Sequence, residues 1–215
     1  MKKIFISPLI QRNKYNENIL TLSLDWLKFF KHIGLSPFTT FTGKTETIKK
    51  ISKEFDALVL CGGGEIYKLE KKFINLQRDS FEKKLINNFL LKKKPILAIC
   101  RGFQLVASMH NAKFEKSNKH VKKTHKLKIN PKSKFIKFKR LTTNSFHQNV
   151  LKSIGKKFTV ISRSDDGFIE IAENVNDKIL CFMFHPERYN FSNLKIKKII
   201  KNFIYGSSNF SSRKR

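Results

Sequence analysis

A cysteine at residue 100 stands where its side chain could act as a nucleophile. Cys100 directly follows a short apolar run, Ile96 to Ile99, which predicts a strand buried on both faces. A glycine and an amphipathic run follow and predict a helix, so Cys100 is expected on a sharp strand-to-helix turn. The positive end of that helix would favour the thiolate over the thiol. Taken alone, this pattern also fits a buried core cysteine.

His185 and Glu187 could supply the base and the group that orients it. Both follow a second apolar run, Ile179 to Phe184, and Pro186 stiffens the segment between them. In an extended segment, residues two apart point to the same side, so Glu187 could hold one imidazole nitrogen while the other faces Cys100. A cysteine nucleophile needs such a base to take its proton and later to protonate a leaving nitrogen. We therefore predict a catalytic triad of these three side chains.

A glycine run follows another apolar segment, Ala57 to Leu60. Gly62, Gly63 and Gly64 allow positive φ and a close approach of the backbone. The Lys-Ser/Thr pair that would complete a phosphate-binding P-loop does not follow. Because loops at the carboxyl ends of adjacent parallel strands meet at one edge of a sheet, we expect this loop beside Cys100. A tight turn without a chemical role is the alternative.

The composition is that of a globular protein of 215 residues, 40% of them hydrophobic. Its three cysteines are far apart and odd in number, which favours a reducing cytoplasm and gives neither a disulfide framework nor zinc-ligand spacing. Apolar runs are too short to cross a bilayer, and the N-terminus lacks the features of a signal peptide. We predict a cytoplasmic protein with no membrane contact, no cofactor and no metal.

The net charge of +29 admits two interpretations. One is nucleic-acid binding, which strongly basic domains often perform. The other is compositional drift, because Lys, Asn, Ile and Phe are abundant together and all have codons made only of A and T. The lysines are scattered and do not alternate with aromatic residues along one stripe, as a single-strand platform requires. We favour drift, and expect nucleic acid not to be the partner.

The elements that must position these residues alternate between apolar strands and amphipathic helices, which predicts a parallel sheet with crossover helices. Asp79 would cap one of these helices, with Glu82 completing a capping box, and Gly34 would end the first. In the first half we expect strands or extended segments at 3–8, 35–41, 57–60 and 96–99, and helices at 16–32, 42–53, 78–91 and from 101 to about 110.

The pattern changes after residue 114. Residues 115–124 are polar and lysine-rich and predict an exposed loop or lid that carries His120, and short antiparallel strands are expected from His125. A polar turn at 142–149, strands at 158–162, 168–172 and 179–184 and a helix at 193–205 complete the chain. We predict an α/β fold in a single domain, residues 1–205, with a mostly parallel central sheet flanked by helices and a small antiparallel addition. Residues 206–215 are expected to form a basic, disordered tail.

Several motifs together resemble the class I glutamine amidotransferases: Cys100-Arg101-Gly102-x-Gln104, Gly62 to Gly64, Asn144-Ser145-Phe146-His147-Gln148 and Phe184-His185-Pro186-Glu187. Within them the chain resembles the gamma-glutamyl hydrolase branch, peptidase C26, through Arg78-Asp79-x-x-Glu82 and Asp166-Gly167-x-x-Glu170. It is also similar to small hydrolases of gamma-glutamyl-CDP-amidate in capsular phosphoramidate pathways, through Leu24-Asp25-Trp26, Lys119-His120, Thr124-His125 and His185-x-Glu187-Arg188. The resemblance implies a flavodoxin-like sheet.

The resemblance also implies a mechanism. The Cys100 thiolate would attack the gamma-carbonyl of a glutamyl amide, with backbone N–H groups of Arg101 and of Gly63 or Gly64 holding the oxyanion. His185 would protonate the departing nitrogen and then activate water against the thioester. The glutamyl amino and carboxylate groups would be held by Gln104, Ser145, Phe146 and His147.

His120 and His125 are candidates to meet the leaving group, the alternative being that they are solvent-exposed loop histidines. The sequence departs from the family pattern at Ala98, where a glycine is usual, and at Glu65, where many gamma-glutamyl hydrolases have Asp. The second departure bears on the leaving group.

Three functions remain open at this point. The first is a hydrolase acting alone, as a monomer or homodimer, on a small gamma-glutamyl conjugate such as gamma-glutamyl-CDP-amidate. The second is a glutaminase subunit that passes ammonia to a synthase partner. The third is a nucleic-acid-binding protein on an inactive amidotransferase scaffold, against which the complete set of triad residues argues.

Overall fold

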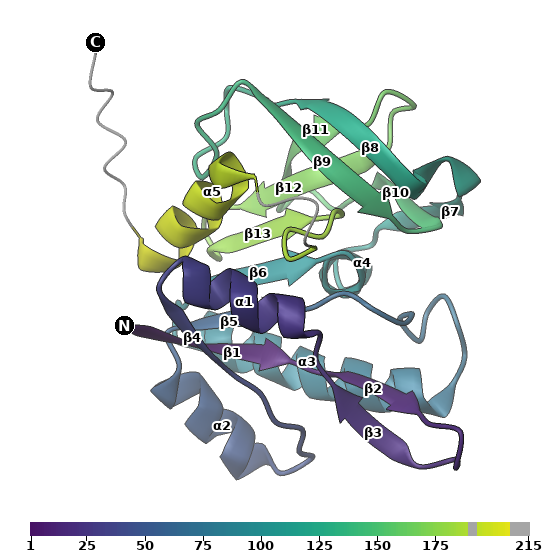
Figure 1. Cartoon of the computed structure of the whole chain (residues 1–215), viewed down its shortest axis with the longest axis vertical. Coiled ribbons are helices and arrows are strands. Elements are labelled where there is room, and N and C mark those ends of the chain that lie inside the picture. The colour runs from purple at the N-terminus through teal and green to yellow at the C-terminus, as the bar shows by residue number, and fades with distance from the viewer. Residues whose placement is uncertain (189–192, 207–215) are drawn as a thin grey trace.

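Strands and helices alternate along the first half of the chain and form a central sheet with helices on both faces (Figure 1). The structure is a computed structural model that describes residues 1–188 and 193–206. Five neighbouring strands are parallel, in the order β4 (Leu35–Phe38), β1 (Lys2–Ser7), β5 (Ala57–Leu60), β6 (Ile96–Ile99) and β13 (Ile179–Phe182). The last three of these strands, β5, β6 and β13, are neighbours and precede the predicted catalytic segments.

Antiparallel strands extend the sheet beyond β13. They are β12 (Ile169–Asn174), β10 (Asn149–Ser153) and β7 (Lys113–Lys116), with β11 (Thr159–Arg163) paired to β12. Two hairpin-like pairs lie outside the sheet: β2 (Leu9–Arg12) with β3 (Asn18–Thr21), and β8 (Val121–Lys128) with β9 (Arg140–Phe146). The predicted fold class, an α/β domain with a mostly parallel central sheet and an antiparallel addition, is confirmed.

Alternation along the strands divides the buried core into two layers. Ile4 and Ile6 of β1 face one layer, where α1 (Leu24–His32) and α5 (Leu194–Tyr205) pack. Phe5 faces the other layer, where α2 (Thr45–Glu54), α3 (Phe73–Leu91) and α4 (Arg101–Ser108) pack. Because successive strand residues point to opposite faces and both faces are covered, the inner strands β5, β6 and β13 are apolar throughout, and polar residues follow at their carboxyl ends.

The helix predicted at 16–32 is wrong over its first half. Residues 18–21 form β3, and α1 begins only at Leu24. Ser23 accepts a hydrogen bond from the backbone N–H of Asp25 and caps the helix there. The apolar residues before Ser23 therefore belong to a strand pair, although their spacing also fitted a helix face.

The capping box predicted at Asp79 is also wrong. The third helix begins at Phe73, so Asp79 lies well inside it. Its carboxylate accepts a hydrogen bond from the backbone N–H of Tyr67 and forms an ion pair with Arg101. Asp79 therefore makes a tertiary contact and does not cap a helix, although its spacing from Glu82 is that of a capping box.

The exposed loop or lid predicted at 115–124 is a folded segment. It ends β7, forms the short 3-10 helix η1 (Asn118–His120) and begins β8, and the side chain of His120 is fully buried. The polar turn predicted at 142–149 is likewise mostly strand, from β9 to the first residue of β10. Hydrogen bonds explain both corrections, because buried polar side chains such as Asn144 and Ser145 have partners across the fold.

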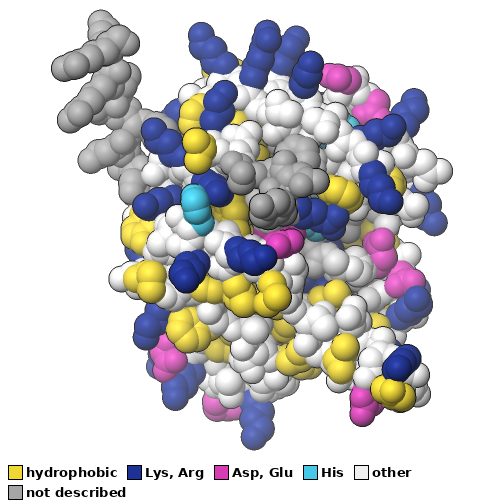
Figure 2. All heavy atoms as spheres, in the orientation of Figure 1, with side chains coloured by type: hydrophobic (Ala, Val, Ile, Leu, Met, Phe, Trp, Pro, Cys, Tyr) yellow, Lys and Arg dark blue, Asp and Glu magenta, His cyan; other side chains and the backbone are white. Residues whose placement is uncertain are grey.

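Charge is spread widely over the surface. On the face shown in Figure 2, Lys and Arg side chains project in many directions and do not gather into one stripe. Among the described residues, the helices are all too short or too polar to cross a bilayer. Of the predicted tail at 206–215, only Gly206 falls among the described residues, where it ends α5 in the left-handed conformation.

Candidate active site

Cys100 lies at the turn between β6 and α4 in a backbone conformation that is rare for a residue with a side chain. Its φ is 48° and its ψ is −104°. The turn is held from both sides: the N–H of Cys100 donates to Phe182 O at 2.7 Å, and its carbonyl accepts from the N–H of Gln104 at 2.9 Å. Backbone strain of this kind persists only where the surrounding structure enforces it. A turn of this type directs the thiol away from the sheet, at the N-terminus of α4.

Gly102 allows this turn to pack against the neighbouring strand. A Cβ atom at this position would lie 2.6 Å from the Cβ of Leu60 and would also collide with the carbonyl oxygen of that residue. Any larger side chain would push the helix away from β5 and move Cys100. The glycine is therefore required by the close approach of α4 to the sheet.

His185 follows β13 and is held by its backbone and by its ring. Its N–H donates to Asn144 Oδ1 at 2.8 Å, and its carbonyl accepts from Asn144 Nδ2 at 2.7 Å. Its Nδ1 is 2.7 Å from Glu187 Oε1. The two residues that period two predicted on one side do meet, and Asn144, quoted only as part of a motif, clamps the histidine from β9.

Cys100 and His185 meet at Gly62, in the loop after β5. A Cβ atom at Gly62 would lie 3.3 Å from the Cβ of Cys100, and 2.5 and 3.2 Å from Cε1 and Nε2 of His185. Any side chain at this position would therefore separate the sulfur from the imidazole. The sequence predicts this loop as a source of N–H groups, and the structure adds a steric role for its first glycine.

The electrostatics of the site favour a charged imidazole. Burial alone would lower the pKa of His185, but the side chain of Cys100 and the carboxylate of Glu187 raise it to about 10. At neutral pH the ring is then an imidazolium beside the sulfur, able to give a proton to a leaving group. The two other cysteines are different, because burial raises the pKa of Cys61 to about 11 and that of Cys181 well above its ordinary value.

The guanidinium group of Arg78 holds the glycine loop through two backbone carbonyls. Its Nη1 donates to Gly63 O at 2.6 Å and its Nη2 to Cys61 O at 3.0 Å. All peptide bonds of the described residues are trans, so the N–H of Gly64 points opposite to the Gly63 carbonyl, away from Arg78. Gly63 and Gly64 both have positive φ, 91° and 70°, which explains why this turn consists of glycines.

Arg78 belongs to a buried set of charges that we call the arginine network: Arg78, Asp79, Glu82 and Arg101. Glu82 accepts from Arg78 Nε at 2.9 Å and from the hydroxyl of Ser7 at 2.7 Å, and Arg101 pairs with both carboxylates. Burial alone would raise the pKa of Glu82, but the two guanidinium groups hold it below its ordinary value. Sequence reasoning gave Arg101 only a backbone role, whereas its side chain ties the residue after the nucleophile to α3.

Two adjoining cavities open beside His185, and Cys100 lines the smaller one. One, of about 350 Å³, is lined by Cys100 and His185 together with Gly63, Gly64, Glu65, Gln104, Val121, Phe146, His147, Gln148, Asn149 and Arg188. The other, of about 500 Å³, extends over Trp26 and Asp25 and shares Gly63, Phe146, His185 and Arg188 with the first. A substrate could therefore place one part on each side of the sulfur and the imidazole.

The predicted substrate-binding residues divide into two groups. Gln104, Phe146 and His147 line the smaller cavity, where Gln104 Nε2 donates to Asn149 O at 3.0 Å. Ser145 does not line it, because its hydroxyl is buried and donates to His120 O at 2.6 Å.

Five residues that line the smaller cavity are not among the predicted site residues: Glu65, Val121, Gln148, Asn149 and Arg188. Arg188 lies 3.9 Å over the ring of Phe146, and Asn149 Nδ2 donates to Glu65 Oε2 at 2.9 Å. Only the family motifs pointed toward Arg188 and Glu65, and no sequence signal marked Asn149.

His120 and His125 lie in neither cavity wall. They meet His147 and Glu170 in the interior, in a set of side chains that we call the histidine cluster. The alternative of solvent-exposed loop histidines is therefore wrong, because the side chain of His120 is fully buried and that of His125 is 13% exposed. Contact of either residue with a leaving group stays a prediction.

Known proteins share both the sequence pattern and the fold. Residues 10–187 match the family model described as Peptidase C26. The chain is 30% identical over 192 residues to a gamma-glutamyl-CDP-amidate hydrolase of Campylobacter jejuni, covering 88% of this chain and 92% of that protein. A glutamine-hydrolyzing GMP synthase of Petrotoga mobilis is 33% identical over 117 residues, which cover 52% of this chain and 22% of that protein. The crystal structure of a glutamine amidotransferase from Thermotoga maritima superposes with a TM-score of 0.63 at 18% identity, covering 97% of this chain and 90% of that one.

Proposed function

The chain belongs to the peptidase C26 family, and on that premise we propose that it is a cysteine-dependent hydrolase that cleaves gamma-glutamyl amide bonds. The observation that carries the proposal is the meeting of Cys100 and His185 at Gly62, with Glu187 on the far nitrogen of the imidazole. These groups in this order are those of a nucleophile, a base and an orienting carboxylate.

In the first half of the reaction, the Cys100 thiolate attacks the gamma-carbonyl carbon and a C–S bond forms as the carbonyl electron pair moves to oxygen. The tetrahedral intermediate collapses with cleavage of the C–N bond, and the departing nitrogen takes the proton of His185 Nε2. A glutamyl thioester and a neutral imidazole remain. Glu187, bonded to Nδ1, holds the ring in the tautomer that leaves Nε2 facing the substrate.

In the second half, His185 Nε2 takes a proton from water, whose oxygen attacks the thioester carbon. The C–S bond breaks, glutamate leaves, and the thiolate and imidazolium return to their first state. Both steps pass through an oxyanion, for which we assign the N–H groups of Arg101 and Gly64, with Gly63 beside them. Arg78 supports this assignment because its bond to the Gly63 carbonyl keeps the Gly64 N–H turned the other way.

For the substrate, we assign the glutamyl group to the smaller cavity, where Gln104, Phe146 and His147 lie beside the sulfur. Ser145 would act only indirectly, through the backbone of His120. The leaving group would extend along the larger cavity, past Arg188, whose guanidinium lies between the two. A guanidinium in this place favours an anionic leaving group such as the nucleotide part of gamma-glutamyl-CDP-amidate, the molecule named for the Campylobacter relative.

A second candidate is a glutaminase that supplies ammonia to a synthase. The similarity to part of a glutamine-hydrolyzing GMP synthase supports it. The spread of basic side chains in Figure 2 supports neither candidate over the other, and it argues against a nucleic-acid groove on the face shown.

The experiment that separates the candidates measures glutamate released by the isolated chain from a panel of gamma-glutamyl conjugates, with glutamine and the CDP-linked amidate among them. We expect turnover of an anionic conjugate without any partner. Steady glutamine hydrolysis that appears only when a synthase is added would establish the second candidate instead.

The matched variants are Cys100→Ala and Cys181→Ala. The first removes the proposed nucleophile and should abolish glutamate release while the protein stays folded. The second removes a core thiol that burial keeps protonated, and should leave turnover within a few-fold of the wild type. Turnover retained by Cys100→Ala would overturn the mechanism.

A further inference from the structure

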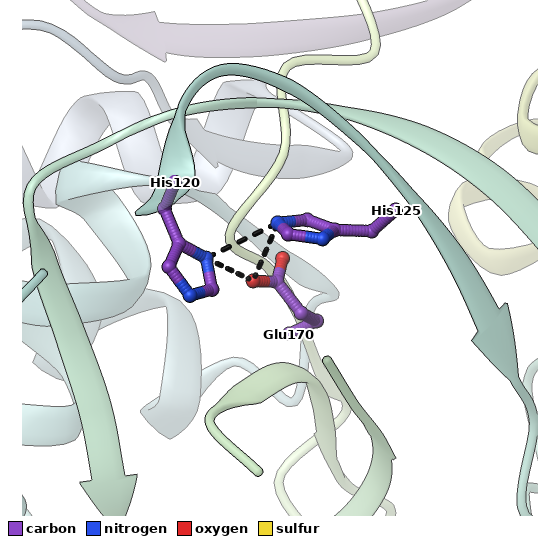
Figure 3. A group of neighbouring side chains, drawn as sticks. All are labelled: His120, His125 and Glu170. Carbon is purple, nitrogen blue, oxygen red and sulfur yellow. Dashed lines mark hydrogen bonds and ion pairs between the residues drawn. The ribbon is translucent and has the colours of Figure 1, made fainter. Parts of the chain in front are cut away.

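Outside the cleft, the histidine cluster brings imidazoles from three segments onto one carboxylate. His120 ends η1, His125 lies in β8, and His147 lies between β9 and β10, while Glu170 lies in β12. Figure 3 shows His120, His125 and Glu170 turned toward one common point. The side chains of His120 and Glu170 are fully buried, and that of His125 is 13% exposed.

The distances between the facing atoms match those of metal ligands. A zinc ion binds imidazole nitrogen and carboxylate oxygen at about 2.0–2.1 Å, which separates neighbouring ligand atoms of a tetrahedron by about 3.3 Å. Here His120 Nδ1 and His125 Nε2 are 3.1 Å apart, and they lie 3.2 and 3.7 Å from Glu170 Oε1. His147 Nε2 lies 3.5 Å from the same oxygen and 3.1 Å from the hydroxyl oxygen of Ser145, so it could become a fourth ligand by giving up that hydroxyl.

A second carboxylate holds the far side of His120. Its Nε2 lies 3.1 and 3.2 Å from the two oxygens of Asp166, and Asp166 accepts in turn from the hydroxyl of Ser164 at 2.6 Å. A carboxylate can only accept, so it places the ring proton on Nε2 and leaves the Nδ1 lone pair facing the cluster. A metal-binding histidine is commonly oriented in this way by an outer carboxylate.

The cluster is also incomplete as it stands. Five buried side-chain oxygen or nitrogen atoms of the described residues lack a hydrogen-bond partner, and three of them lie here: both carboxylate oxygens of Glu170 and Nδ1 of His147. A buried carboxylate without a donor is costly, and a cation at the common point would satisfy it.

A proton is the simpler cation, and it completes the cluster only in part. His120 Nδ1 lies 3.2 Å from Glu170 Oε1 and 3.1 Å from His125 Nε2, so one proton on this nitrogen faces two acceptors. Glu170 Oε2 makes no hydrogen bond among the described residues. A metal ion accepts electron pairs from all of the converging atoms at once.

We propose that His120 Nδ1, His125 Nε2 and Glu170 Oε1, with His147 Nε2 in reach, bind a divalent transition-metal ion of the zinc class. Imidazole and carboxylate ligands suit this class of ion. The ion would tie the β8–β9 pair to β12 of the central sheet and would stiffen the wall of the cleft that His147 lines. The three ligands His120, His125 and Glu170 have no part in the proposed hydrolase reaction, and only His147 is shared with the glutamyl pocket.

The test measures metal bound by the full chain after chelator treatment and addition of Zn²⁺ or Co²⁺. We expect one ion per chain, a rise in Tm on adding Zn²⁺, and with Co²⁺ the visible bands of a tetrahedral site without a thiolate-to-cobalt band. Glu170→Gln and His125→Ala should each weaken Zn²⁺ binding by about tenfold or more.

Two control variants and a check for a competing metal site complete the experiment. Glu173→Gln, a buried glutamate on the same strand, and His32→Ala, an exposed histidine, should retain the ion. Zn²⁺ could instead bind at Cys100 and His185, in which case Cys100→Ala would lose it and Glu170→Gln would keep it. That pattern, or the absence of stoichiometric binding to the wild type, would overturn the proposal.

Discussion

Two sets of buried charges lie near the proposed nucleophile Cys100, and they differ in how completely their charges are paired. In the arginine network, Glu82 has a donor on each oxygen, and two guanidinium groups balance the two carboxylates. In the histidine cluster, Glu170 is as deeply buried, yet both of its oxygens lack a hydrogen bond within the described residues. The same residue type at the same depth is therefore satisfied by the chain in one place and not in the other.

The difference separates a structural device from a binding site. A buried ion pair whose partners are all supplied by the chain holds its neighbours in place, and here it holds the carbonyls of Cys61 and Gly63. Among the described residues, the ion-pair neighbours of Glu170 are histidines, so its counter-charge must come from a bound ion or from protons on those rings. Glu187 is the intermediate case, since one oxygen is hydrogen-bonded to His185 and the other has no hydrogen-bond partner among the described residues.

Glu82→Gln should have the largest effect on stability. It leaves two buried guanidinium groups against one carboxylate, and breaking a buried pair in this way typically costs about 3–5 kcal/mol. The measurement is the free energy of unfolding in urea. Glu115→Gln, which removes an exposed pair with Lys152, should cost less than about 1 kcal/mol.

The same variant has a signature in pH. Because the folded-state pKa of Glu82 is lowered, its contribution to stability is complete above its unfolded pKa, near 4.5, and is lost as pH falls through the folded value. The difference between wild type and Glu82→Gln should therefore shrink below pH 4.5. If wild type and Glu82→Gln differed little in stability at every pH, Glu82 would stabilise the fold as little as we expect of Glu170. The contrast between the arginine network and the histidine cluster would then be lost.

Arg78→Lys should next affect the rate and not the binding of substrate. A lysine keeps the charge but lacks the fork that reaches Glu82 and two carbonyls together. If the Gly64 N–H is an oxyanion donor, kcat should fall by up to the about 10²–10³-fold that one lost donor costs, with KM little changed. The control is Arg163→Lys, since Arg163 also donates to two carbonyls, those of Lys152 and Gly167, outside the cleft. Equal losses in both variants would contradict a role for Arg78 in positioning the loop.

Glu187→Gln should have a smaller effect on rate and a clear one on pH dependence. The base remains, so kcat/KM should fall by less than the about 10²–10⁴-fold that positioned proton transfer typically contributes. The pKa of His185 is raised to about 10 with help from Glu187, so the imidazolium is lost only as pH rises through that value. Without the carboxylate, the high-pH limb of the kcat/KM profile should move to lower pH. A limb that stays in place would mean that Cys100 alone sets the charge of the ring.

The contrast also explains what the sequence could predict. Cys100 and His185 could be placed because each follows an apolar run, and the carboxyl ends of neighbouring parallel strands must meet. The fold class followed from the same runs. Local patterns therefore sufficed to place a residue that follows a strand, because the strand determines where that residue lies.

Both buried clusters escaped prediction because their members come from different segments. Asp79 and Glu82 have the spacing of a capping box, and only the position of Arg101 in space shows that they form ion pairs. His120 and His125 lie in a lysine-rich stretch whose exposed strand positions imitate a loop. A buried polar group depends on partners far away in the chain, which no local pattern contains.

Glu170→Gln in metal-free protein should have the smallest effect, and it tests the contrast most directly. Replacing an unpartnered buried carboxylate by a neutral amide removes a desolvated charge and breaks no hydrogen bond, so the free energy of unfolding should change by less than about 1 kcal/mol. Glu173→Gln on the same strand is the comparison, because that carboxylate accepts from Ser133 Oγ and from the backbone N–H of Lys134. Its loss should cost about 1.5–3 kcal/mol, as hydrogen bonds to charged groups do.

If Glu170→Gln instead destabilises the metal-free chain as strongly as Glu82→Gln, the histidines already carry the missing charge as protons, and the cluster is a second network with all of its charges paired. With Zn²⁺ at about 100 times its dissociation constant, the free energy of unfolding of the wild type should rise by about 2.7 kcal/mol, and that of Glu170→Gln by much less. The difference between the two proteins measures how much Glu170 contributes to binding the ion.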